Sequence, residues 1–324
     1  MDWHPSSPLV VMQKRAEMLA QIRAFFASCG VLEVDTPVLS VAGATDPHIA
    51  SFVTEYRPEG GEGRQCFYLH TSPEFPMKRL LAAGVGSIYQ VCKVFRNGEQ
   101  GRWHNPEFTL LEWYRVGFDH HALMDEMDAL LAEVAGCGPA LRVTYRDVFL
   151  QNTGLDPLEA DIPEVREKAL ALGVVASLDS LEGIDRNGWL DLILTHRIVD
   201  TLGQNGRPTF VYDYPASQAA MAQVRPGPPA VAERFEVYLG GVELANGFHE
   251  LRDPKEQRKR LEADREERHR MGLPLIPLDE RLLDALSHGL PPCAGVALGI
   301  DRLLMAVTGA TSIDAVLAFP VGRA

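Results

Sequence analysis

Apolar side chains near the start of the chain recur with the period of an α-helix. Met18, Ile22 and Phe25 lie three or four positions apart, and this spacing places them on one helix face. Gly30 follows and suits the end of a helix. The next residues, VLEVDTPVL, contain the β-branched side chains typical of strands. We therefore expect a helix over residues 10–28, followed by a strand that is broken at Pro37.

The rest of the chain alternates between strand-like and helix-like patterns. Runs of β-branched and aromatic residues predict strands at 66–71, 88–95, 107–117, 209–215, 234–251 and 293–300. Helical periodicity predicts helices at 76–83, 121–135, 164–172 and 189–201. This order favours an α+β fold, in which helices flank a mixed, mainly antiparallel sheet.

One segment, residues 252–270, is dense in charges of both signs. Opposite charges lie four positions apart, which supports a helix through the pairs Glu256–Arg260, Asp264–Arg268 and Glu266–Arg270. The whole chain carries a net charge of −13, whereas a broad nucleic-acid surface needs cations that neutralise phosphates. We expect a solvated helix face here rather than a nucleic-acid patch.

Composition narrows the class of protein further. An apolar content of 46% and a charged content of 23% over 324 residues are typical of a soluble globular protein. No apolar run reaches the length of a membrane span, and no signal peptide is indicated. The five cysteines are scattered, which favours a reduced, cytoplasmic setting. The histidines, His120 and His121 among them, lack ligand spacing and are expected at the surface.

Two arginines about 200 positions apart indicate phosphate chemistry. Arg96 ends an apolar run and precedes a short glycine-containing loop, and Arg302 follows the small-residue run 295–300 at the start of a helix. A guanidinium grips phosphate oxygens bidentately and stays charged at any working pH. Neither GxxxxGK[ST] nor a strand-linked GxGxxG is present. We therefore expect the two arginines to clamp a nucleoside triphosphate on an antiparallel sheet.

The motifs around these arginines resemble those of the class II aminoacyl-tRNA synthetases. FRNGEQGRWHNPEF resembles motif 2, GVALGIDRLL resembles motif 3, and CGVLEVDTPVLS resembles motif 1. GGVELANGFHEL resembles the metal-and-substrate strand of the lysyl, aspartyl and asparaginyl subgroup, and YLHTSPEFPMKRLL resembles the amino-acid-binding loop of the lysyl enzymes. The resemblance implies one catalytic domain over 1–324, with motifs 1, 2 and 3 at about 26–40, 92–115 and 293–308. It also implies a homodimer.

Motif 1 begins near residue 26, close to the start of the sequence, so we expect no N-terminal anticodon-binding barrel before it. This arrangement resembles the stand-alone paralogues of lysyl-tRNA synthetase that ligate (R)-β-lysine onto a lysine of translation elongation factor P. The resemblance implies ATP-dependent formation of an adenylate, with lysine or β-lysine as substrate, elongation factor P as acceptor, and no tRNA. Two alternatives remain: a truncated lysyl-tRNA synthetase that charges tRNA, and a pseudo-enzyme that binds ATP or a partner.

Within this family, particular residues are expected to hold ATP. Arg96 would contact the α-phosphate and the attacking carboxylate, and Arg302 the γ-phosphate. The other residues expected to bind ATP are Asn97, Gly98, Asn105, Glu243, Leu244 and Gly299. Motif 2 normally reads Arg-x-Glu, and its glutamate accepts the adenine amino group, but glycine stands at that position here. Either Glu99 or the loop backbone at Asn97 and Gly98 would then read adenine.

The resemblance assigns Mg²⁺ to Glu243 and Glu250. Seven residues separate them, so a regular strand would place them on opposite faces. The Asn246–Gly247 pair permits a bulge or a bend that would bring both carboxylates to one site. Solvated strand glutamates are the alternative reading.

The remaining assigned residues would bind the amino acid. Glu74, Glu250 and the hydroxyl group of Tyr114 would surround its ammonium group, with Ser72 and Pro73 in the pocket wall. Ala297 replaces the middle glycine of motif 3, and its methyl group would crowd the α-amino group of ordinary lysine. A β-amino acid would avoid that contact, so Ala297 favours β-lysine. The alternative reading is that alanine is only a tolerated small residue at this position.

Overall fold

The computed structural model describes residues 3–60, 63–175 and 183–324. The chain divides into two compact units, and each is described here by itself. The first combines Met1–Gly117 with Leu251–Ala324, and the second is Phe118–Glu250. The expectation of a single catalytic domain over 1–324 stays a prediction.

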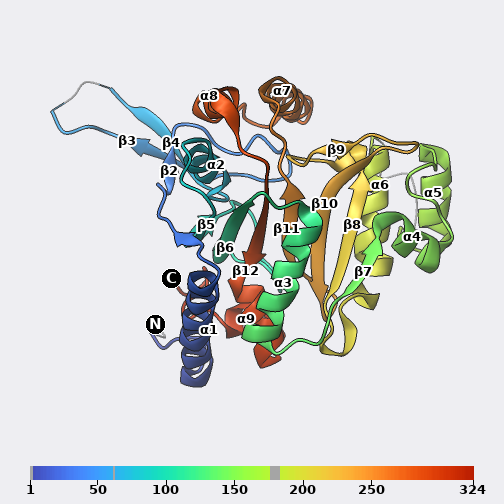
Figure 1. The fold of residues 1–324 in the computed structure, drawn as a ribbon, viewed down its shortest axis with the longest axis horizontal. Helices are drawn as coiled ribbons and strands as arrows, with labels where there is room; N and C mark the ends of the chain where they lie inside the picture. The colour runs from blue at the N-terminus through green and yellow to red at the C-terminus, as the bar shows by residue number, and fades with distance from the viewer. Residues whose placement is uncertain (1–2, 61–62, 176–182) are drawn as a thin grey trace. The chain divides into compact units, whose positions relative to one another are not determined.

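The first unit contains the sheet that carries motifs 2 and 3 (Figure 1). Its strands follow the order β1, β5, β6, β12; β1 is parallel to β5, and the other neighbours are antiparallel. Their bounds are Leu32–Glu33 for β1, Ile88–Phe95 for β5, Glu107–Val116 for β6 and Cys293–Gly299 for β12. The strands predicted at 88–95, 107–117 and 293–300 are confirmed.

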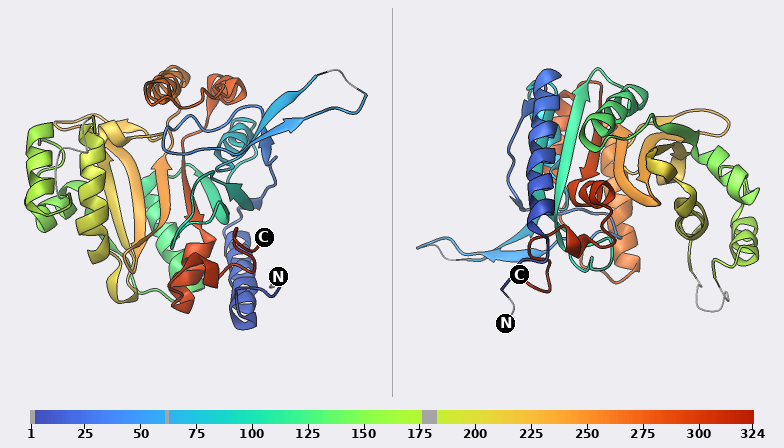
Figure 2. Two further views of the ribbon diagram at one scale, coloured as in Figure 1. Left: turned by 180° about the vertical axis from the view of Figure 1, so that it is seen from behind. Right: turned by 90° about the horizontal axis from the view of Figure 1, so that it is seen from below.

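Helix α1, Leu9–Ser28, packs its predicted apolar stripe into this unit. Met18, Ile22 and Phe26 are fully buried, and the Phe26 ring lies 4.5 Å from the ring of Tyr89 and 5.3 Å from that of Trp113. Burial of each such side chain stabilises the fold by about 1.5–3 kcal/mol. The helix therefore lies along the strands of the sheet (Figure 2), and its prediction is confirmed.

The proline in motif 1 separates two short strands that enter different sheets. β1 ends before Pro37, and β2, Leu39–Ser40, begins after it. β2 pairs with β4, Gln65–Leu69, which pairs in turn with β3, Val53–Tyr56. Proline cannot donate to a ladder, so the predicted break at Pro37 marks the change of sheet. β3 and β4 project from the first unit as an arm (Figure 1).

Four further helices belong to the first unit: α2 (Glu74–Ala82), α7 (Pro254–Arg270), α8 (Glu280–Gly289) and α9 (Ile300–Thr308). The predicted ion pair between Arg260 and Glu256 of α7 is present at 3.0 Å. The expectation of a solvated face is wrong for Arg268, which is 4% exposed and donates to the carbonyl oxygens of Pro274 and Asp46, each at 3.0 Å. Helix α7 thus anchors the loop before β3.

The second unit is built on an antiparallel hairpin. β10, Val231–Leu239, and β11, Val242–His249, are joined by Gly240 and Gly241. Both glycines have positive φ, +60° and +73°, as a tight two-residue hairpin turn requires. β8, Thr209–Pro215, pairs with β10, and β7, Leu141–Thr144, runs parallel to β8. A short strand, β9, Val224–Arg225, also pairs with β10.

The α-helices that the structure describes in the second unit are α3 (His120–Ala135), α4 (Tyr145–Thr153), α5 (Ile162–Ala171) and α6 (Arg186–Ile193). Helix α3 contacts β10 and β11, and α4 contacts β8. Tyr145, Phe149, Trp189 and Val211 lie in one buried core. The helix predicted to reach residue 201 ends earlier, because α6 passes into a π turn at Leu194–Ile198 and a 3-10 turn at Val199–Thr201.

Both units combine mainly antiparallel strands with flanking helices, so the predicted α+β class is confirmed. Among the residues that the structure describes, no helix combines the length and the apolar character needed to span a membrane.

Candidate active site

Arg96 lies directly after β5, where the chain leaves the sheet. Its backbone N–H donates to the carbonyl oxygen of Pro106 at 2.9 Å, which closes the loop between β5 and β6. The guanidinium carbon lies 5.1 Å from the ring centre of Phe108, and Nη1 lies 3.6 Å from Oε1 of Glu99. Nε is buried without a hydrogen-bond partner among the described residues. Arg96 is therefore positioned by its surroundings while one donor stays available.

Arg302 reaches the same loop from the start of α9. Its Nη2 lies 2.8 Å from Nε2 of His104, and its Nε donates to the carbonyl oxygen of Trp103 at 3.4 Å. The neighbouring Asp301 is 1% exposed and accepts from the backbone N–H of Thr109 at 2.6 Å. Asp301 thus ties α9 to β6, which fixes the turn that carries Arg302.

His104 lies under the influence of both arginines. Burial lowers the pKa of His104, and the charges of Arg302 and Arg96 lower it further. The charge of Glu99 raises this pKa but does not cancel the other effects. A neutral imidazole has one acceptor nitrogen, so Nε2 can accept from Arg302. His104 was not among the residues predicted for the site. Its place inside the motif 2 loop is the signal that could have identified it.

The loop after Arg96 adopts a turn that suits its sequence. The backbone N–H of Asn97 donates to the carbonyl oxygen of Ala50 at 2.7 Å, and Gly98 has a φ of +85°. This conformation favours glycine, which gives Gly98 a structural reason to replace the usual glutamate. Glu99 lies beside Arg96. How adenine is read stays a prediction.

Asn105 uses both ends of its amide within the protein. Its Nδ2 donates to the carbonyl oxygen of Glu107 at 2.6 Å, and its Oδ1 accepts from the backbone N–H of Val321 at 2.9 Å. The side chain is 5% exposed. It therefore holds the C-terminal segment beside the loop, and its contact with ATP stays a prediction.

A buried carboxylate that sequence reasoning missed lies at the centre of the predicted amino-acid pocket. Glu112 in β6 is 2% exposed. It accepts from the hydroxyl group of Ser72 at 2.6 Å and from that of Tyr114 at 2.7 Å. Burial and then the charge of Glu74 raise its pKa to about 8. A glutamate inside the apolar run TLLEWYR was the available signal.

Glu74 is the first residue of α2, directly after Pro73, and its carboxylate forms an ion pair with Lys78. Lys78, one helical turn later and 1% exposed, lies 2.5 Å from its Oε1. The structure thus brings together Ser72, Glu74 and Tyr114, and adds Lys78 and Glu112. The substrate-binding role predicted for Ser72, Glu74, Tyr114 and Glu250 stays a prediction. Two carboxylates opposite one ammonium group leave room for a second cation.

Ala297 lies on the strand next to Glu112. In the antiparallel pairing of β12 with β6, Ala297 is opposite Glu112 and Gly295 is opposite Tyr114. Directly opposed residues share a sheet face, with Cβ atoms roughly 4.5–5.5 Å apart. The methyl group of Ala297 therefore lies on the face that carries the buried carboxylate. Gly299 ends the same strand, immediately before α9.

In the second unit, a bulge controls the direction of the predicted metal ligands. Val237 is opposite Ala245, whereas its neighbour Tyr238 is opposite Glu243, so Leu244 is the extra residue. The bulge predicted at Asn246–Gly247 is wrong in position, because the register is regular there.

The bulge at Leu244 nevertheless has the expected effect on the carboxylates. One extra residue restores the even spacing between Glu243 and Glu250, which puts both on one sheet face. Glu250 is 1% exposed. Burial lowers the pKa of Arg234 on the paired strand β10, but the charges of Glu236 and Glu243 outweigh burial and raise that pKa above its usual range. Two carboxylates on one face fit the hard oxygen ligands that Mg²⁺ prefers.

Comparison with known proteins identifies the family. The model of the tRNA synthetases of class II (D, K and N) matches residues 6–323. The chain is 54% identical over 323 residues to the elongation factor P–(R)-β-lysine ligase of Vibrio cholerae, which covers 100% of this chain and 99% of the relative. It is 50% identical to the ligases of the same name from Yersinia enterocolitica and Salmonella typhi, and each match covers at least 99% of this chain and 98% of the relative. The chain belongs to the class II tRNA synthetases of the D, K and N group.

Proposed function

We propose that this chain activates (R)-β-lysine with ATP and transfers it to a lysine side chain of elongation factor P. The observation that carries the proposal is the similarity to ligases of this name along essentially the whole of both chains. In the first step the β-lysine carboxylate attacks the α-phosphorus, the bond to pyrophosphate breaks, and an adenylate forms. In the second step the acceptor amine attacks the adenylate carbonyl carbon, AMP leaves, and an amide bond forms.

The arginines perform most of the first step, since such catalysis depends on positioning and on neutralisation of charge. The guanidinium of Arg96 contacts the ring of Phe108 and the carboxylate of Glu99, and its Nε remains available as a donor. Arg96 binds the α-phosphate together with the attacking carboxylate. Arg302 binds the γ-phosphate, and His104 holds its guanidinium in place. Asn97, Gly98, Asn105, Leu244 and Gly299 complete the proposed ATP site.

The buried acidic cluster of the first unit binds an ammonium group of the amino acid. Glu112 and Glu74 outnumber Lys78, and an ammonium group taken out of water needs a carboxylate partner. Ser72 and Tyr114 orient Glu112 through their hydroxyl groups. Pro73 shapes the pocket wall, and Glu250 also contributes to substrate binding.

Glu243 and Glu250 are the proposed Mg²⁺ ligands. When bound, the ion would neutralise ATP phosphate charge. We expect Glu243→Gln to raise the Mg²⁺ concentration needed for half-maximal activity, because a neutral amide is a weaker ligand for a hard cation. A Mg²⁺ titration of pyrophosphate exchange measures this, with Glu133→Gln on the exposed surface of α3 as control. An unchanged titration would leave Glu243 a structural residue.

Ala297 is the proposed discriminator between the lysine isomers, since it shares a face with Glu112. We expect Ala297→Gly to improve kcat/KM for α-lysine relative to β-lysine by roughly ten- to a hundredfold, because one methyl group changes discrimination by about 1–3 kcal/mol. Adenylate formation with each isomer gives the ratio. If the ratio does not move, another residue selects the isomer.

A two-acceptor assay tests the proposed function. The protein is incubated with ATP and β-lysine, and either purified elongation factor P or tRNA is added. We expect elongation factor P to gain the mass of one β-lysyl group, and RNase treatment to leave this gain unchanged. Efficient charging of tRNA at physiological salt would instead favour a truncated lysyl-tRNA synthetase.

We also propose that the enzyme is a cytoplasmic homodimer. Two observations support this. All five cysteines are free, and the motif 1 segment exposes large apolar side chains, including 54% of Leu32 and 46% of Leu39. Exposed apolar side chains gathered in one segment are typical of an interface. Light scattering of the purified protein measures the mass in solution.

A further inference from the structure

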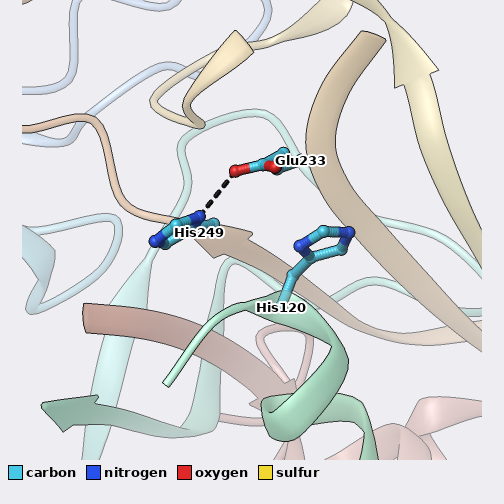
Figure 3. Close-up of side chains that lie close together, drawn as sticks. All are labelled: His120, Glu233 and His249. Atoms are coloured by element: carbon cyan, nitrogen blue, oxygen red, sulfur yellow. Dashed lines mark hydrogen bonds and ion pairs between the residues drawn. The ribbon is translucent and has the colours of Figure 1, made fainter. Parts of the chain in front are cut away.

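A second cluster of possible metal ligands lies within the second unit, formed by His120, Glu233 and His249. One ligand atom from each lies within 4.8 Å of the other two. Nδ1 of His249 is 2.5 Å from Oε2 of Glu233, and the His120 ring lies beside this pair (Figure 3). Ligand atoms around one zinc ion lie roughly 3–3.5 Å apart, given bonds of about 2.0–2.2 Å. Small side-chain rotations would therefore close the site.

The backbone holds two of these residues in a defined position. Glu233 and Arg234 of β10 together oppose the single residue Asp213 of β8, and this bulge directs the side chain of Glu233. The backbone N–H of Glu233 donates to the carbonyl oxygen of Gln223, whose own N–H donates to the carbonyl oxygen of His249. Gln223 thus links Glu233 to His249 before any ligand binds.

The environment of His120 is independent evidence that the cluster binds a ligand. Its side chain is buried, with 1% exposed, and neither ring nitrogen has a hydrogen-bond partner among the described residues. Its closest charged neighbour is Asp213, whose Oδ1 lies 3.5 Å from Nε2. A buried polar group without a partner is costly, and coordination to a metal would satisfy it. The expectation that His120 lies at the surface is wrong.

The charged residues around the cluster suit a bound cation, because they can orient the side chains that would ligate it. Arg225 lies 2.5 Å from Asp213 and 3.4 Å from Glu233. Two carboxylates against one guanidinium leave a negative balance around two imidazoles. The side chains of His249 and Glu233 are 21% and 16% exposed, so an ion can enter from solvent. Arg225 and Asp213 would orient the ligands, as outer partners do in metal sites.

We propose that His120, Glu233 and His249 form a binding site for a divalent transition metal, of which Zn²⁺ is the best match. Two imidazoles and one carboxylate are a known ligand set for zinc with an open fourth position. Nitrogen ligands favour such an ion over Mg²⁺. The site links the start of α3 to β10 and to the end of β11. It is independent of the proposed ligase activity.

Zinc binding to the whole protein tests this site. The chain is stripped with a chelator, titrated with ZnCl2 in excess Mg²⁺, and its retained zinc is measured after dialysis. We expect about one zinc ion per chain, and Glu233→Gln and His249→Gln should each weaken binding by about ten- to a hundredfold or more. Circular dichroism checks that the variants are folded. Both target residues are partly exposed, so neither change opens a cavity in the core.

His196→Gln is the matched control, because His196 is an exposed histidine of the same unit. Zinc retention by this variant should equal that of the wild type. Equal retention by all three variants would overturn the proposal, as would retention of no zinc by the wild type. Cobalt substitution provides a second readout: a thiolate charge-transfer band would assign the metal to cysteines and also overturn it.

Discussion

Replacing Arg302 by alanine is expected to slow adenylate formation by about 10²–10³-fold, the typical cost of removing one donor that stabilises charge in a water-excluded site. The guanidinium is held by His104 and by the carbonyl oxygen of Trp103, so it would meet the proposed phosphate in a fixed orientation. A charge-assisted contact of this kind is stronger than a neutral one. ATP–pyrophosphate exchange under saturating β-lysine measures the loss.

Arg281→Ala on α8 is a suitable control, because it removes an exposed arginine from the same unit. Its exchange rate should match that of the wild type. Unfolding in urea separates a local effect from instability, since Asp301, the neighbour of Arg302, ties α9 to β6. Exchange by Arg302→Ala within threefold of the wild-type rate would remove Arg302 from the phosphate site.

Glu112→Gln is expected to reduce kcat/KM for β-lysine by about 30- to several-thousandfold, because truncating one partner of a buried charge pair costs roughly 2–5 kcal/mol. The amide keeps the size of the side chain and one acceptor for the hydroxyl groups of Ser72 and Tyr114. It removes the charge that Glu112 is proposed to present to the substrate ammonium group. Exchange kinetics against β-lysine concentration measure this, and Glu107→Gln, an exposed change on the same strand, is the control.

The same variant should change how stability depends on pH. In the folded protein without substrate, burial and the charge of Glu74 raise the pKa of Glu112 from 4.5 to about 8. The folded state therefore keeps a proton that the unfolded state loses, and the free energy of unfolding falls as pH rises from about 4.5 to about 8. The fall is at most about 5 kcal/mol. Glu112→Gln should flatten this fall in urea titrations; an equal slope in both proteins would contradict the assignment.

Local patterns predicted most elements of the fold. The apolar stripe of α1, the break at Pro37 and the runs that became β5, β6 and β12 depend on residues close together in the sequence. For the same reason the motif positions of Arg96 and Arg302 could be identified, since Arg96 directly follows β5 and Arg302 lies in the first turn of α9, just after β12. Interactions within a few residues decide these features, and periodicity records them.

Two features of the sites depend on pairing between distant segments. In the sequence, Glu112 is a single charged residue within an apolar run. Its burial becomes evident only from the packing of Ser72, Glu74 and Tyr114 around its carboxylate. The bulge that puts Glu243 and Glu250 on one face lies at Leu244, because the register with β10 decides it.

The order of the elements, the α+β class and the family can be predicted from the sequence, because local periodicity and short motifs encode them. The burial and the partners of particular side chains depend on how distant segments pack in the folded chain. His104 meets Arg302 across 198 positions, and His120 meets Glu233 and His249 across more than 100. The burial and the protonation state of such side chains depend on every segment that packs around them, so the pattern within one segment cannot predict them.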